Sequence, residues 1–94
     1  MSILIVDDSP PVVRLLQATL ERAGYTQTVS ADCGAAVLSY LGIDPPAEAV
    51  AEVECILLDV IMPGEDGVEV CRCIKAHPAY ADTPIIMVTM IDQA

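Results

Sequence analysis

The sequence predicts one α/β domain with an open parallel β-sheet and helices on both faces of the sheet. Short apolar runs rich in β-branched residues alternate with longer segments whose apolar side chains recur at helical spacing. The apolar runs show no polar alternation, which is typical of strands covered on both faces. The chain of 94 residues is long enough for one core and too short for two. We therefore expect four strands and about three helices, joined by right-handed crossovers.

The first strand is predicted over Ser2–Val6, a continuous apolar run after the serine. Two aspartates end this strand, and Ser9 then stands where a side chain commonly caps a helix. Pro10 follows at the first helical position, where its missing N–H costs nothing. Apolar residues at helical spacing continue over 10–23, and Gly24 stands where a glycine typically ends a helix.

The next part of the chain is more polar. Residues 25–31 predict a second strand, whose polar character places it nearer an edge of the sheet. Residues 32–41 predict a second helix with alanine, valine and leucine side chains for packing. The connection over 42–54 contains two prolines and four acidic residues, and its part 47–53 has room for an extra helical turn.

The third and fourth strands complete the predicted sheet. Residues 55–59 form an apolar run that ends in an aspartate, and 60–65 read as a loop because they contain a Pro-Gly pair. Asp66 is placed to cap the third helix, with Glu69 in the capping-box position. A proline ends that helix, and 84–89 predict the fourth strand.

Composition and charge exclude several classes of function. Acidic residues outnumber basic ones by 14 to 4, which gives a formal charge of -10. A phosphate backbone repels such a chain, so we expect no direct nucleic-acid binding and no attraction to anionic membranes. Apolar residues make up 54% of the chain, which rules out intrinsic disorder. No apolar run approaches the roughly 20 residues of a membrane helix, and the N-terminus lacks the pattern of a signal peptide.

The four cysteines do not form a spaced framework. Cys71 and Cys73 are two residues apart on a predicted helix, so their side chains point in different directions. This spacing is poor for a metal site or a disulfide. We interpret all four cysteines as reduced thiols of a cytoplasmic protein.

Side chains with chemical potential gather where the predicted strands end. Asp7 and Asp8 follow the first strand, Asp59 ends the third, and Thr89 ends the fourth. In open α/β sheets functional groups lie at the carboxyl ends of the strands, so these residues are expected to converge. Three converging carboxylates repel one another unless a cation neutralises them, and their hard oxygens suit Mg²⁺. A carboxylate can also act as a nucleophile, so the sequence predicts a magnesium site beside a phosphate-accepting aspartate.

Three motifs, 3–9, 57–67 and 84–89, closely resemble the receiver domain of bacterial two-component response regulators. They stand in the order and spacing of that family and span the chain from its first residues to its last. The resemblance implies a flavodoxin-like receiver fold over 1–94. It also implies a phosphorylation-dependent switch in phosphorelay signal transduction. Such a domain is a phosphoacceptor that assists its own phosphorylation and dephosphorylation, and we do not expect an enzyme in the usual sense.

The resemblance also assigns roles to individual residues. Asp59 is implied to form the aspartyl-phosphate, and Asp8 and Asp59 to bind Mg²⁺ directly. Asp7 would act mainly through water, and the backbone carbonyl of Ile61 would complete the protein ligands. Thr89 is implied to be the switch residue, whose hydroxyl bonds a phosphoryl oxygen. The phosphodonor would be a histidine kinase or a phosphotransfer protein that docks near the helix 10–23.

The sequence departs from the family pattern in three ways. It ends before the fifth strand and helix of the family, which include a phosphoryl-binding lysine, so we expect a C-terminally incomplete domain. The strand 84–89 then has an open apolar edge, which favours homodimers or strand exchange. Met90 replaces the small residue usual after the switch threonine and narrows the approach to the acceptor. Ile61 and Ile91 hinder an attacking water, which predicts slow autodephosphorylation.

Three other functions compete with that of a working receiver. A flavin-binding protein of the same architecture is disfavoured because Asp7 and Asp8 repel a flavin phosphate. A phosphatase with an aspartate nucleophile generally places that nucleophile at the end of the first strand and needs more chain for its substrate. A pseudo-receiver, used only for dimerisation or docking and never phosphorylated, remains a distinct alternative. The output that such a domain would control is not encoded in these residues.

Overall fold

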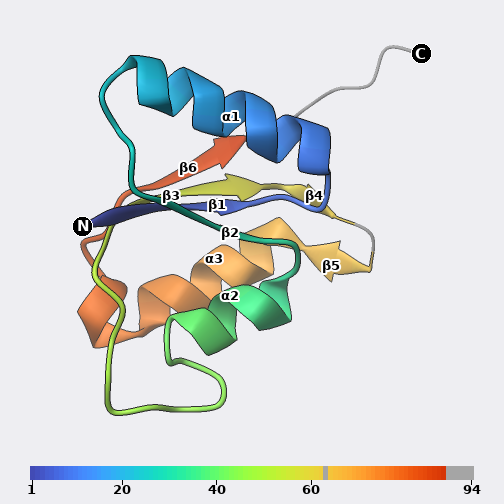
Figure 1. The fold of residues 1–94 in the computed structure, drawn as a ribbon. Coiled ribbons are helices and arrows are strands. Elements are labelled where there is room, and N and C mark those ends of the chain that lie inside the picture. Colours follow the sequence, from blue (N-terminus) through green and yellow to red (C-terminus); the bar gives the residue numbers. More distant parts are fainter. Residues whose placement is uncertain (63, 89–94) are drawn as a thin grey trace.

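The computed structural model describes residues 1–62 and 64–88, in which strands and helices alternate along the chain (Figure 1). The elements, in order, are β1 Ser2–Val6, α1 Pro10–Arg22, β2 Thr28–Ala31, α2 Gly34–Tyr40, β3 Val53–Asp59, β4 Ile61–Met62, β5 Glu65–Asp66, α3 Gly67–Ala76, the 3₁₀ helix η1 Pro78–Tyr80, and β6 Ile85–Val88.

The main sheet has four parallel strands in the order β2-β1-β3-β6, so the predicted fold class is confirmed. Residue Leu4 of β1 lies opposite Val29 on one side and Ile56 on the other. Helix α1 covers one face of the sheet, and α2 and α3 cover the opposite face (Figure 1). Strand β2 stands at an edge, as its polar sequence predicts.

The main core lies between the sheet and the pair α2 and α3. Apolar side chains from the strands and from both helices are buried there: Leu4, Val6, Ile56, Leu58, Val37, Leu41, Val70 and Ile74. On the opposite face, no residue of α1 is buried, although its apolar residues keep helical spacing. A cleft of about 250 Å³ lies on this side, lined in part by Leu20, Leu57 and Ile86. The α1 side is therefore packed less completely toward β3 and β6, although Ile5 of β1 is fully buried on that side.

A buried tyrosine fixes the long connection between α2 and β3. The Tyr80 hydroxyl, in a side chain only 2% exposed, donates a hydrogen bond to the Leu41 carbonyl at 2.6 Å. The same oxygen accepts the Ala51 N–H at 3.0 Å. One side chain from η1 thereby satisfies backbone groups at both ends of the connection.

Several local details differ from the sequence-based expectations. The second strand begins at Thr28 rather than at residue 25, and residues 47–53 form no helical turn. The expected loop after Asp59 contains the two short antiparallel strands β4 and β5. Two residues are too few to show a strand periodicity, so the sequence gives no sign of this hairpin.

The helix caps also differ in part from the prediction. Ser9 holds the N-cap position of α1, but its side chain makes no capping hydrogen bond. Asp66 does cap α3, because its Oδ1 accepts the Val68 N–H at 2.9 Å. The Glu69 carboxylate pairs instead with Arg72 at 2.9 Å. Among the described helices, none is both long enough and apolar enough to cross a membrane.

Candidate functional site

The candidate site lies at the carboxyl end of the two central strands. Strands β1 and β3 are adjacent and parallel, and Val6 lies opposite Leu58. The residues that follow these partners, Asp7 and Asp59, therefore reach the same edge of the sheet. The pairing thus explains how residues more than fifty positions apart in the chain come together.

Three carboxylates converge at this edge. One oxygen from each of Asp7, Asp8 and Asp59 lies within 4.8 Å of the others. Asp7 is 5% exposed and Asp59 7% exposed, whereas Asp8 is open to solvent. The acidic residues singled out in the sequence thus form one cluster, with two buried members and one at its mouth.

Backbone N–H groups orient the two buried carboxylates. The Ser9 N–H donates to Asp7 Oδ1 at 2.8 Å, and the Ile61 N–H donates to Asp59 Oδ1 at 3.0 Å. In each case the donor lies two residues after the aspartate, so the chain turns back on its own carboxylate. These bonds fix the direction of each side chain before any ligand arrives.

The electrostatics of the cluster favour a cation. Burial raises the pKa of Asp7 above its ordinary value of 3.8, and the nearby charges of Asp59 and Asp8 raise it further, against the lowering effect of the Ser9 N–H. A bound cation would remove this repulsion. The donor set consists of carboxylate oxygens, which are the ligands of hard cations, so these residues fit the Mg²⁺ that the sequence predicts.

A glycine brings the start of α3 close to the end of β3. A Cβ atom on Gly67 would lie 2.7 Å from the Asp59 carbonyl oxygen and 2.8 Å from the Val60 Cα. Any larger residue would therefore push the helix away from the strand that carries Asp59. The β4–β5 hairpin spans the short distance between these two elements.

The structure describes only part of the remaining predicted site. The Ile61 backbone lies beside Asp59, and its side chain is 65% exposed. Its carbonyl as a metal ligand stays a prediction. Thr89, Met90 and Ile91 lie outside the described residues.

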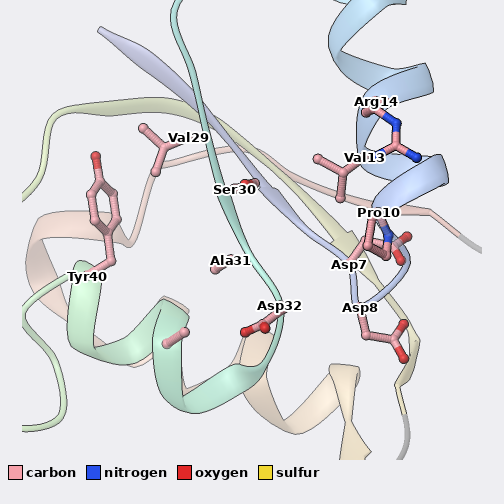
Figure 2. A pocket seen from close by; sticks show the side chains of 11 residues that line it. Asp7, Asp8, Pro10, Val13, Arg14, Val29, Ser30, Ala31, Asp32 and Tyr40 are labelled. Atoms are coloured by element: carbon pink, nitrogen blue, oxygen red, sulfur yellow. The ribbon is translucent and has the colours of Figure 1, made fainter.

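A groove beside the acidic cluster is not predicted by the sequence. It has a volume of about 550 Å³ and extends from Asp7 and Asp8 along β2 (Figure 2). Its walls come from α1 and α2, which lie on opposite faces of the sheet, so only the fold reveals it.

Comparison with known proteins identifies one family. The response regulator receiver domain matches residues 3–94. The response regulator PleD of Caulobacter vibrioides is 39% identical over 90 residues, which cover 96% of this chain and 18% of PleD. The transcriptional regulatory protein ResD of Bacillus subtilis is 41% identical over 87 residues, covering 93% of this chain and 32% of ResD. The chain thus spans less than a third of these relatives.

Solved structures agree with this comparison. The signal receiver domain of a signal transduction histidine kinase from Syntrophus aciditrophicus is 33% identical, with a TM-score of 0.79 over 98% of this chain and 64% of that one. The chemotaxis response regulator CheY4 of Vibrio cholerae is 29% identical, with a TM-score of 0.79 over 99% of this chain and 70% of that one.

Proposed function

Since the chain belongs to the family of response regulator receiver domains, we propose that it is a phosphorylation-dependent switch in a two-component system. Receiver domains are phosphoacceptor signalling modules rather than classical enzymes. The observation that carries the proposal is the convergence of Asp7, Asp8 and Asp59 at the end of the central strands. The proposed receiver unit comprises residues 1–94.

In the proposed reaction, a carboxylate oxygen of Asp59 attacks the phosphorus of a phosphohistidine. The new O–P bond forms as the P–N bond breaks, and the electron pair of that bond returns to the imidazole, which takes up a proton. The Ile61 N–H holds Asp59 in position for this attack through its 3.0 Å bond. We assign Thr89 as the residue whose hydroxyl then binds a phosphoryl oxygen.

The metal site of this proposal comprises Asp8, Asp59 and the Ile61 carbonyl, with Asp7 acting through water. Mg²⁺ held there supplies positive charge that offsets the negative charge of the transferring phosphoryl group. The neighbouring charges of Asp59 and Asp8, which add to the effect of burial in raising the pKa of Asp7, would be neutralised by a cation at this position. The proposed donor is a histidine kinase or phosphotransfer protein that docks near α1, and the proposed location is the cytoplasm.

Intact mass spectrometry tests the proposal directly. After incubation with Mg²⁺ and acetyl phosphate, the chain should gain about 80 Da, the mass of one phosphoryl group. Asp59→Asn should abolish the gain. Asp32→Asn is the matched control, because Asp32 is an exposed aspartate outside the carboxylate cluster, and it should keep the gain. A gain that persists in Asp59→Asn would overturn the assignment of the acceptor.

A second candidate is the pseudo-receiver, a module for docking or dimerisation. The observation in its favour is the apolar surface of β6, where Ile86 is 52% and Met87 38% exposed. Strand β6 pairs only with β3 among the described strands, so its outer edge could join a second copy. Mg²⁺ binding without a mass gain, together with a dimer in analytical ultracentrifugation, would favour this candidate over the switch.

A further inference from the structure

The outer edge of β2 carries backbone groups that the sheet does not use. The Gln27 carbonyl accepts the Ile3 N–H and the Ala31 carbonyl accepts the Asp7 N–H, each at 3.0 Å. The backbone N–H and C=O groups of the odd-numbered residues therefore point toward β1. Because successive residues of a strand point their backbone groups to opposite sides, Thr28 and Ser30 face away from β1. Among the described strands, β2 pairs with β1 alone.

This edge lies inside the groove of about 550 Å³. On one side the groove is lined by Pro10 and Val13 of α1, and on the other by Tyr40 of α2 (Figure 2). Ala36 of α2 also belongs to the lining. Ser30, between these walls, is exposed. The side chains of an added strand would point alternately toward α1 and toward α2. Both sets of side chains would therefore contact apolar residues of the groove.

The charged residues of the groove indicate which kind of ligand it would bind. Asp7, Asp8 and Asp32 lie at one end, and Arg14 is the single basic residue among the described residues of the lining. The whole chain carries a formal charge of -10. Both features favour a basic partner and oppose an acidic peptide or a second copy of this chain.

We propose that β2 is a docking site for an extended, basic peptide segment of a partner protein, which adds as a further strand in the groove between α1 and α2. Main-chain hydrogen bonds to Thr28 and Ser30 would provide affinity, and a lysine or arginine near Asp32 would provide selectivity. The inference does not depend on phosphorylation of Asp59. It does place the occupant beside the acidic cluster, because the groove ends at Asp7 and Asp8.

Fluorescence anisotropy with short synthetic peptides provides the first test. The probe is a labelled valine peptide with a lysine at each end, roughly six residues long, which matches a typical strand. We expect this peptide to bind, and the valine–glutamate version and a version with N-methylated alternate amides to bind much more weakly. Equal binding of the N-methylated peptide would overturn the proposal, because that peptide lacks the donors needed along one edge.

A pair of variants at one position separates the backbone from the side chain. Ser30→Pro removes the outward N–H and should weaken binding about tenfold. Ser30→Ala keeps this N–H and should bind as the unaltered chain does. A folded Ser30→Pro variant with unchanged affinity would contradict strand addition.

Hydrogen exchange on the unaltered chain provides a test that needs no variant. The amides of Thr28 and Ser30 should become protected when the lysine peptide binds. The amide of Val29, which faces β1, should change little. Protection at β6 instead of β2 would overturn the proposal, as would a β2-mediated dimer that excludes the peptide.

Discussion

On the face of the sheet covered by α2 and α3, Ile56 and Leu58 are fully buried, whereas on the face covered by α1 their neighbour Leu57 keeps contact with solvent. These residues belong to one strand and have similar side chains. On the α1 face, Ile5 of β1 is fully buried beside Leu57, whereas Ile86 of β6, on the other side of Leu57, is 52% exposed. The incomplete cover therefore lies over β3 and β6, not over the whole face. Helices α2 and α3 contribute buried residues, and α1 contributes none. An apolar stripe on a helix thus shows which side faces the sheet, but not how completely that side is covered.

The largest expected effect comes from shortening one leucine on each face. Leu58→Ala should lower the free energy of unfolding by about 3–4 kcal/mol, because the side chain is fully buried and leaves a cavity. Leu57→Ala should lower it by only about 1–2 kcal/mol, since this side chain keeps part of its exposure. Urea denaturation of both variants measures the difference. Equal losses would show that the two faces contribute alike.

Tyr80 provides a second test, on the side of the sheet covered by α2 and α3. Tyr80→Phe removes the hydroxyl that is hydrogen-bonded to the Leu41 carbonyl and the Ala51 N–H. It should lower the free energy of unfolding by about 1–3 kcal/mol, because these backbone groups lose their partner. Tyr25→Phe is the matched control on the α1 side, where the ring is 48% exposed, and it should change little. Thermal denaturation compares the two. A stable Tyr80→Phe variant would mean that water replaces the hydroxyl.

The next prediction concerns Asp7, which lies at the carboxyl end of β1, at the rim of the sheet. Its pKa is raised above 3.8, mainly by burial, so the folded chain binds a proton more tightly than the unfolded chain. Between 3.8 and the raised pKa, the free energy of unfolding therefore falls as the pH rises. Asp7→Asn should be more stable than the unaltered chain above this window, and the advantage should shrink as the pH falls toward 3.8.

Urea denaturation at several pH values measures this effect without metal. Saturating Mg²⁺ should reduce or reverse the advantage, because it stabilises the chain whose carboxylates bind it. A variant that is less stable than the unaltered chain above the raised pKa, in the absence of metal, would contradict the interpretation.

The smallest effect on stability is expected at Ile61. Its side chain is 65% exposed, so Ile61→Asn should leave the free energy of unfolding nearly unchanged. If Asp59 is the acceptor, the polar side chain should help an attacking water and shorten the half-life of the phosphorylated chain severalfold. Loss of the added phosphoryl mass over time gives the rate. An unchanged half-life would remove Ile61 from the control of dephosphorylation.

The sequence predicts the central architecture well because its signals are strong and repeated. Apolar runs without alternation identify the strands of a parallel sheet, and their pairing follows from the fold class. Once Asp7 and Asp59 are placed at strand ends, their convergence also follows. The position of β2 at an edge is visible in its polar residues.

Other features depend on contacts that no local pattern encodes. The β4–β5 hairpin forms from two-residue strands that cannot show a periodicity. Tyr80 is a single aromatic residue after a proline, and its role appears only when α2 and the following connection reach its hydroxyl. The groove beside β2 likewise requires two helices on opposite faces of the sheet.

The hydrogen bonds of Tyr80 make the connection between α2 and β3 a suitable place for an insertion. Leu41 and Ala51 meet at one hydroxyl, so the connection between them leaves and re-enters the fold at nearly the same point. The entropy cost of lengthening such a closed loop rises only with the logarithm of its length. Residue Val50 and its exposed neighbours therefore mark a site for inserting a tag or a whole domain. We expect an insertion there to leave the sheet register and the carboxylate cluster intact, because this connection contributes no residue to either.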